Sequence, residues 1–277
     1  MTDAKLAGLE ERFVQVKGVR MRYFVGGSGP PLLLVHGLGG AAANWTELAP
    51  LLVRRHRLLV PDLPGHGGST PLPAVSGLAP FADRVALVAE REGMLPASVV
   101  GHSLGGMVVL RLALRRPADV SALVLAAGAG LSVGNVWGRQ LLSLFSTARP
   151  GRLAARYRSW VSRSGLLRRL VFGFVSVADP PGLTEEAVEG FLAAHLLHTD
   201  VDSAWQALRA DDPRLELDGI TCPVLVLWGA EDAQLPLDDA FEYTRRLRGR
   251  LRVIPGCGHL LIGERPDACD RAIADFL

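Results

Sequence analysis

The chain has 277 residues, of which 49% are hydrophobic and 21% charged, and its formal net charge at pH 7 is +2. This length suits one large α/β domain with room for an insertion, and the composition excludes a disordered chain. The near-neutral balance of charge indicates neither a nucleic acid nor a strongly acidic partner.

The sequence lacks the patterns of a signal peptide, a membrane span and a metal site. The first twelve residues are polar and charged, and no apolar run reaches about 18 residues, so we expect neither a signal peptide nor a membrane span. The three cysteines, Cys222, Cys257 and Cys269, do not have the spacing of a metal site. We therefore expect a reduced, cytoplasmic protein without a bound metal. The sequence does not indicate an oligomeric state.

The first half of the chain alternates strand and helix patterns. Polar and apolar residues alternate on both sides of Gly18, which predicts a hairpin over residues 12–25. The elements that follow are expected, in chain order, at residues 32–35, 45–54 (a helix capped by Asn44), 56–60, 81–92 (helix), 97–100, 104–116 (helix) and 122–126. This alternation predicts a parallel sheet with helices on both faces.

The pattern changes between residues 131 and 208. This segment has no strand runs and carries helical patterns with interspersed aromatic residues, so we expect an all-helical insertion, or cap. The alternation then resumes in chain order with a strand at 224–228, a helix at 238–248, a strand at 251–254 and a closing helix at 265–277. The α/β core is therefore expected to comprise residues 1–130 and 209–277, with the cap at 131–208.

The pattern G-x-S-x-G, formed by Gly101, Ser103 and Gly105, lies between an expected strand and an expected helix. In that context it predicts a nucleophile elbow, a tight turn that strains the serine backbone. The glycines are expected where neighbouring backbone comes so close that a Cβ would clash. The helix N-terminus would then offer free N–H groups to an oxyanion. The alternative is a glycine-rich turn without chemistry.

Four further turn-rich segments each follow an expected strand: His36–Gly39, Asp62–Gly67, Gly229–Asp232 and Gly256–His259. Together with the elbow, and in the same order, they resemble the motifs of the α/β-hydrolase fold family with a helical cap. The resemblance implies a mostly parallel eight-stranded sheet and a serine esterase or lipase-like member. Because ligands of such sheets bind at the carboxyl ends of the strands, all five motifs are expected at one rim.

A serine hydroxyl needs a base to remove its proton, and the base needs a carboxylate to orient it. In this fold the chain order is Ser, acid, His, and His259 is the one histidine that follows Asp232. We therefore expect a triad of Ser103, Asp232 and His259. Glu231 competes for the role of the acid, and the family's Gly-x-x-Asp pattern favours Asp232.

Two backbone N–H groups are expected to form the oxyanion hole. One belongs to Leu104, directly after the serine, and the resemblance implies that the other belongs to Leu38.

Other polar residues of the motifs have expected roles outside the chemistry. His36 and His66 lie in turns before the serine, where hydrogen bonds to the loops are expected. Asp62, together with His66, is expected to brace the rim. His102 lies inside the elbow, and its side chain should point away from Ser103.

The type of nucleophile narrows the reaction. Epoxide hydrolases and haloalkane dehalogenases of the family use an aspartate at the elbow, whereas Ser103 favours acyl transfer without a cofactor. The first prediction is a carboxylesterase-like serine hydrolase acting on a small hydrophobic ester or related acyl substrate. The alternatives are the same triad acting on a C–C bond of a vinylogous diketone, on a lactone or an amide, or in perhydrolysis. A ligand receptor on this fold is a further alternative.

The expected cap is basic in its first half. Residues 131–178 hold eight arginines and no aspartate or glutamate. Apolar residues recur among them at helical spacing: Leu153, Tyr157, Trp160 and Val161. We interpret this as an amphipathic helix with a solvated basic face and an apolar face over a hydrophobic active site. A second interpretation is attraction to anionic membrane surfaces or acidic substrates. For His195 and His198 the default expectation is an exposed helix face, and the alternative is contact with the substrate.

Overall fold

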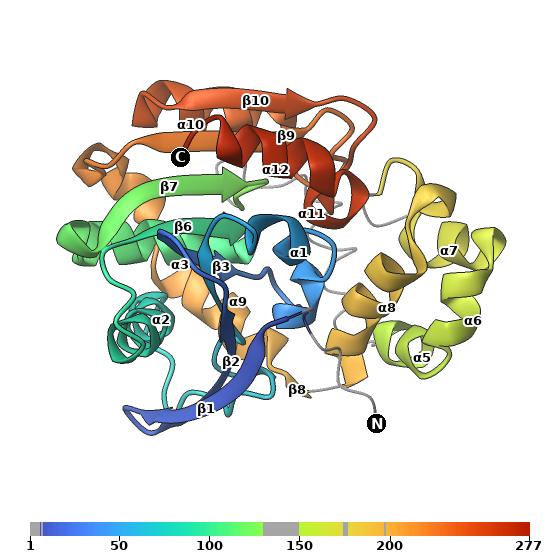
Figure 1. The fold of residues 1–277 in the computed structure, drawn as a ribbon, viewed down its shortest axis with the longest axis horizontal. Helices are drawn as coiled ribbons and strands as arrows, with labels where there is room; N and C mark the ends of the chain where they lie inside the picture. The colour runs from blue at the N-terminus through green and yellow to red at the C-terminus, as the bar shows by residue number, and fades with distance from the viewer. Residues whose placement is uncertain (1–5, 7, 130–149, 174–176, 197) are drawn as a thin grey trace.

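The computed structural model describes residues 6, 8–129, 150–173, 177–196 and 198–277. They form one main β-sheet flanked by helices (Figure 1). Its strands are β1 (Glu10–Val16), β2 (Val19–Gly26), β3 (Pro31–Val35), β4 (Arg57–Pro61), β6 (Ala97–His102), β7 (Val120–Ala126), β9 (Val224–Gly229) and β10 (Arg250–Ile254).

Within the described residues the sheet has eight strands in the order β1-β2-β4-β3-β6-β7-β9-β10. The pairs β1–β2 and β2–β4 are antiparallel, and the remaining pairs are parallel. This confirms the predicted mostly parallel, eight-stranded sheet. Strands β7 and β10 run to the right in Figure 1, so the loops that follow the parallel strands leave at that edge.

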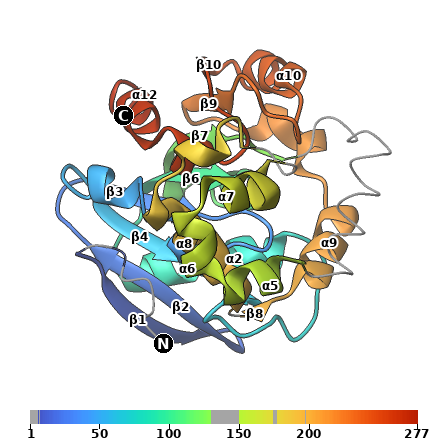
Figure 2. The same cartoon turned by 90° about the vertical axis from the view of Figure 1, so that its right-hand side faces the viewer.

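Continuous aliphatic runs form the central strands because those strands are covered on both faces. All residues from Leu32 to Val35 in β3 are fully buried, as are those from Val226 to Trp228 in β9. Helices cover both faces of the sheet (Figure 2). They are α1 (Ala49–Leu52), α2 (Ala79–Arg91), α3 (Leu104–Arg115), α10 (Leu237–Leu247), α11 (Leu261–Glu264) and α12 (Pro266–Ala274), with 3-10 turns η1 (Ala42–Trp45), η2 (Pro117–Asp119) and η5 (Pro213–Gly219).

The helix expected over residues 45–54 is wrong. The structure has the short turn η1 and then α1, with a break between them. Pro50 explains the break, because a proline ring clashes with the preceding turn and its nitrogen cannot donate a helical hydrogen bond. A helix can therefore begin only just before Pro50. Asn44 lies within η1, where its Oδ1 accepts a hydrogen bond from the Ala41 N–H at 2.6 Å, so it closes the start of this short turn and does not cap a helix that begins at residue 45.

The chain between β7 and β9 is helical where the structure describes it, apart from one two-residue strand. Its helices are α5 (Pro150–Arg156), α6 (Arg158–Arg163), α7 (Gly165–Phe172), α8 (Glu185–Ala193) and α9 (Val201–Ala210), with turns η3 (Pro180–Gly182) and η4 (Ala194–Leu196). Helices α5 to α8 lie beyond the carboxyl ends of the strands (Figure 1). A two-residue strand, β8 (His198–Thr199), pairs with β5 (His66–Gly67) outside the main sheet.

Parts of the expected cap, residues 131–149, 174–176 and 197, lie outside the described residues. The described part is mostly helical, as predicted, but the expectation of no strand is wrong, because His198 and Thr199 form β8. The division into core and cap stays a prediction. None of the helices that the structure describes is both long enough and apolar enough to cross a bilayer.

Candidate active site

The strained strand-to-helix turn predicted at Ser103 is present. Ser103 precedes α3 with φ 52° and ψ −118°, a conformation that costs a non-glycine residue about 1–3 kcal/mol. Its N–H donates to the Ala126 carbonyl at 3.1 Å, and its carbonyl accepts from the N–H groups of Gly106 and Ala129 at 2.9 and 3.0 Å. The turn is thus held both by its own helix and by the end of β7.

The glycines of the elbow allow close approach of backbone segments. A Cβ on Gly105 would overlap the carbonyl oxygen of Val35 in β3, and one on Gly101 would overlap the carbonyl of Gly105. This confirms the reason for which the sequence predicts glycine at both positions. Helix α3 therefore begins directly against the backbone of β3, and Leu104, its first residue, has an N–H without a partner inside the helix.

Asp232 and His259 form a buried hydrogen-bonded pair. The His259 Nδ1 lies 2.8 Å from Asp232 Oδ2, and the two side chains are 4% and 1% exposed. The other carboxylate oxygen of Asp232 accepts from the N–H groups of Gln234 and Leu235, both at 2.9 Å. Because an ionised carboxylate only accepts hydrogen bonds, we assign the proton of the neutral imidazole to Nδ1. The Nε2 atom of His259 is then left as an acceptor.

The loop that carries His259 is held at three consecutive residues. The contacts are Cys257 N–H to Glu231 Oε2 (2.8 Å), Gly258 N–H to Glu264 Oε2 (3.0 Å) and His102 Nε2–H to the His259 carbonyl (2.9 Å). These hydrogen bonds position the His259 backbone from three sides. The same oxygen of Glu264 also accepts from the Ala178 N–H at 2.8 Å, which joins this loop to the chain just before α8.

His102 connects the two halves of the site. It directly precedes Ser103, and its ring centroid lies 5.1 Å from that of His259. Burial lowers the pKa of His102 to about 3, so the ring is neutral and its Nε2–H donates to the carbonyl. The sequence does not predict this contact, because it joins positions 157 residues apart.

The two carboxylates that compete for the role of the acid, Glu231 and Asp232, contact different groups. Glu231 is hydrogen bonded to the Cys257 N–H, whereas Asp232 meets the imidazole of His259. Adjacent residues of the same loop thus have separate tasks, one holding the histidine loop and the other contacting the histidine ring.

The loop containing Leu38 lies against the elbow. Gly37 to Gly40 form a turn closed by the Gly40 N–H and the Gly37 carbonyl at 3.1 Å, in which Gly39 has a φ of 67° that favours glycine. A Cβ on Gly37 would lie only 3.0 Å from the Cβ of Ser103. The segments that carry Leu38 and Leu104 therefore both adjoin the serine.

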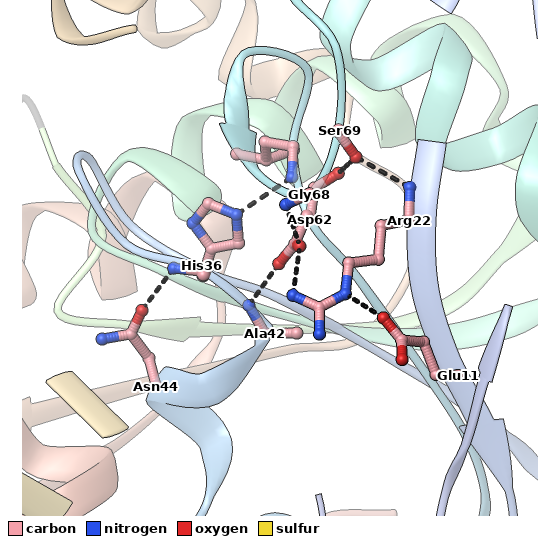
Figure 3. A network of polar contacts seen from close by, with 10 residues as sticks. Glu11, Arg22, His36, Ala42, Asn44, Asp62, Gly68 and Ser69 are labelled. Atoms are coloured by element: carbon pink, nitrogen blue, oxygen red, sulfur yellow. Dashed lines mark hydrogen bonds and ion pairs between the residues drawn. The ribbon is translucent and has the colours of Figure 1, made fainter. Parts of the chain in front are cut away.

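A buried polar network around Asp62 holds the loop after β3 that contains Leu38 (Figure 3). The Asp62 carboxylate accepts hydrogen bonds from the Ala42 N–H at 2.6 Å and the Gly68 N–H at 2.8 Å, and lies 3.5 Å from the Arg22 guanidinium. Burial raises the pKa of Asp62, against these partners, which lower it. The network ties the loop after β3 to the loop after β4.

The histidines of these two loops make structural hydrogen bonds. His36 donates from Nδ1 to the Gly37 carbonyl at 2.8 Å and accepts the Leu63 N–H at Nε2, 2.9 Å away. His66 Nδ1 lies 3.1 Å from the Pro64 carbonyl. Both rings are fully buried, and the expected loop-holding roles of His36, His66 and Asp62 are confirmed.

The sequence suggested an exposed helix face for His195, and this expectation is wrong. It belongs to η4 and is half-buried, and a Cβ on Gly39 would lie 3.9 Å from its Cε1. The end of the α8 segment thus reaches the loop that contains Leu38. The side chain of His198 lies outside the description. Among the described residues there is no cluster of three or more potential metal ligands.

Three buried histidines should make the protein sensitive to mild acid. Burial lowers the pKa of His36 and His66 from 6.5 to about 4 and that of His102 to about 3. Below pH 6.5 the unfolded chain therefore binds protons that the folded chain does not. The stability that these histidines contribute is complete above pH 6.5 and is lost as the pH falls toward 4. Each can change the free energy of unfolding by up to about 1.4 kcal/mol per pH unit.

The raised pKa of Asp62 changes the free energy of unfolding with pH in the opposite direction. The contribution of one histidine is therefore measured best by comparing the wild type with a variant that lacks it. In urea titrations from neutral pH to pH 5, His66→Gln should lose stability less steeply than the wild type, by up to one proton's slope. Equal slopes in the two proteins would show that His66 does not titrate in this way.

A strained serine at the turn from strand to helix, with an Asp–His pair in the loops after later strands of a mostly parallel sheet, defines a hydrolase of the α/β type. The family model for the alpha/beta hydrolase fold matches residues 30–266. The chain belongs to the alpha/beta hydrolase fold family.

Similar proteins include an esterase and another hydrolase. The chain is 31% identical to the pimeloyl-[acyl-carrier protein] methyl ester esterase of Nitrosomonas europaea, over 84% of this chain and 90% of that protein. It is 26% identical to the 2-hydroxy-6-oxo-6-phenylhexa-2,4-dienoate hydrolase of Burkholderia cepacia, over 100% and 96% of the two chains. A solved structure of a membrane phospholipase A superposes with a TM-score of 0.75 and 29% identity, over 98% and 86% of the two chains.

Proposed function

We propose that this chain hydrolyses carboxylic esters through an acyl-enzyme formed on Ser103. The observation that carries the proposal is the buried pair of Asp232 and His259, together with the hydrogen bond from His102, the residue next to the strained serine, to the His259 carbonyl. A buried imidazole oriented by a carboxylate is the base that a serine hydroxyl needs to become a nucleophile.

In the proposed reaction His259 Nε2 takes the proton of Ser103 as its Oγ attacks the ester carbonyl. Asp232 stabilises the imidazolium that forms. The N–H groups of Leu38 and Leu104 hold the oxyanion, and each such donor typically contributes about 10²–10³ in rate. His259 then gives its proton to the departing alcohol, and water cleaves the acyl-enzyme by the same steps in reverse. This scheme requires no metal or organic cofactor.

We also propose that residues 131–208 act as a cap over this site and that the substrate is a small hydrophobic ester. Two contacts support a cap: His195 lies beside Gly39, and Ala178 is hydrogen bonded to Glu264, which holds the histidine loop. The described α8 is apolar on its inner side, where Phe191 packs against Gly263.

A second candidate function is cleavage of a C–C bond by the same three residues. It is favoured by the similarity to the Burkholderia cepacia dienoate hydrolase, which extends over the full length of this chain. A lactone, an amide, perhydrolysis and a receptor role are the other options for the same site, and a substrate panel separates them.

The test is active-site labelling combined with such a panel. A fluorophosphonate should modify the wild type with one equivalent, and peptide mass spectrometry should place the label on Ser103. p-Nitrophenyl acetate, butyrate and octanoate should give a burst of nitrophenol followed by steady turnover. Label on another residue would refute the proposed nucleophile. Turnover confined to a vinylogous diketone would replace ester hydrolysis by the second candidate.

A further inference from the structure

Helices α5, α6 and α7 carry large apolar side chains that face solvent. The most exposed are Trp160 at 72% and Leu166 at 70%, and Leu153, Tyr157 and Leu170 are each more than half exposed. Other exposed large apolar side chains of the described chain lie on separate elements: Phe13, Leu215, Phe241 and Leu277. The three helices therefore concentrate exposed apolar surface in one region.

This arrangement corrects the expectation of an apolar face over the active site. Of the four apolar residues at helical spacing, only Val161 is buried, while Leu153, Tyr157 and Trp160 point to solvent. The N–H of Tyr157 bonds to the Leu153 carbonyl at 3.3 Å, and that of Trp160 to the Tyr157 carbonyl at 2.9 Å, so hydrogen-bonded turns join α5 to α6 across Tyr157, whose own backbone is not helical (φ −107°, ψ 23°). All three side chains are more than half exposed, and we call them the outer stripe of this segment.

The inner side of these helices already has a partner within the protein. Ala155 and Val161 are buried, and both α5 and α6 pack against α8. In Figure 1 the three helices lie outside α8, and in Figure 2, which views the molecule from that side, they lie in the foreground. The outer stripe is therefore a face of the protein on the same side as the carboxyl ends of the strands.

The charge of this face has one sign. Residues 150–173 contain six arginines and no aspartate or glutamate. Arg156, Arg163 and Arg169 are exposed. Arg163 lies 3.8 Å from Glu185 of α8, and because both side chains are more than half exposed, that pair is weak. Arginines beside a tryptophan and leucines match a surface that is anionic outside and apolar just beneath.

We propose that the outer face of α5–α7, defined by Leu153, Arg156, Tyr157, Trp160, Leu166, Arg169 and Leu170, docks on a membrane surface that contains anionic lipids. The arginines would lie among the lipid headgroups, and the apolar side chains would enter the boundary between headgroups and acyl chains. An acidic soluble substrate would match the arginines but would leave the exposed tryptophan and leucines in water. This inference goes beyond ester hydrolysis and does not depend on it.

Co-sedimentation of the full chain with lipid vesicles tests the proposal. On vesicles of phosphatidylcholine mixed with phosphatidylglycerol, the bound fraction should be at least about tenfold higher than on phosphatidylcholine alone. Raising the salt to about 0.5 M should remove most of this preference, because it screens exposed charges. Equal binding to both kinds of vesicle would overturn the proposal.

Paired variants assign the binding to this face. Trp160→Ser with Leu166→Ser removes apolar contacts, and Arg156→Glu with Arg169→Glu reverses charge. Each pair should weaken anionic-vesicle binding by at least about tenfold. The matched controls are Leu215→Ser, at a residue 82% exposed on η5, and Arg54→Glu, at an exposed arginine elsewhere; both should bind as the wild type does.

All four proteins should keep the circular dichroism spectrum and the thermal transition of the wild type, which shows that the fold is intact. Ser103→Ala should bind vesicles like the wild type, so that a failure of the proposed reaction and a failure of docking can be distinguished. If the paired variants bind like the controls, the proposal is wrong. It is also wrong if ultracentrifugation shows a wild-type dimer that the paired variants abolish and vesicles do not bind.

Discussion

Replacing Ser103 with alanine is expected to lower kcat on an activated ester by about 10⁴-fold or more. The variant lacks the oxygen that would form the acyl-enzyme, while the donors proposed for the oxyanion hole belong to the backbone and remain. Burst and steady-state kinetics on p-nitrophenyl butyrate measure the loss. The burst should disappear together with the turnover, because no covalent intermediate can form.

The matched control for this variant is Ser98→Ala, which removes a hydroxyl from the same strand, β6. Ser98 Oγ lies 3.2 Å from Ser121 Oγ in an exposed pair, so its loss should leave turnover within the error of the assay. Thermal unfolding should show both variants folded, since alanine at 103 meets the same backbone strain as serine. Turnover by Ser103→Ala close to that of the wild type would reject the mechanism.

Asp232→Asn should lower kcat by about 10⁴-fold, whereas Glu231→Gln should change it less than about tenfold. An asparagine at 232 can present its NH₂ to His259 Nδ1, which would favour the imidazole tautomer with its proton on Nε2. That tautomer cannot accept the serine proton. At 231, glutamine keeps an oxygen that can accept the Cys257 N–H, so the histidine loop keeps its contact.

This comparison tests the assignment of the acid within one dipeptide. Both changes remove a negative charge and preserve side-chain size, so they differ only in which group each residue contacts. A loss for Glu231→Gln as large as that for Asp232→Asn would transfer the role of the acid to Glu231. Equal Ser103 labelling in the wild type and Glu231→Gln would support the assignment made above.

The α/β core was predictable because its signals are local. A strand buried on both faces needs a run of aliphatic residues, and such runs mark β3, β4, β6, β7 and β9 in the sequence. The helix expected at 45–54 failed where a single residue, Pro50, outweighed the hydrophobic spacing around it. The sequence analysis expected the outer stripe to face the active site, whereas it faces solvent. Helical spacing identifies an apolar face but does not show what covers that face.

The residues of the candidate site were predictable because they too lie in short local motifs. Ser103, Asp232 and His259 each occur in a short motif at the end of a strand, so the rim of the sheet brings their segments together. The contacts that hold the histidine loop could not be found in this way. His102 and Glu264 reach it from elements whose relative placement depends on the packing of the whole sheet.

The order of the strands also means that the two sides of the proposed active site differ in how easily they unfold locally. Ser103 follows β6, which is paired on both sides near the middle of the sheet, whereas His259 follows β10, which pairs with β9 alone among the described strands. Terminal strands separate at a lower free energy than central ones. On warming, the proposed general base, His259, would therefore be lost to fraying at that edge of the sheet while the proposed nucleophile, Ser103, still lay in folded protein. Inactivation would then begin before most of the sheet melts.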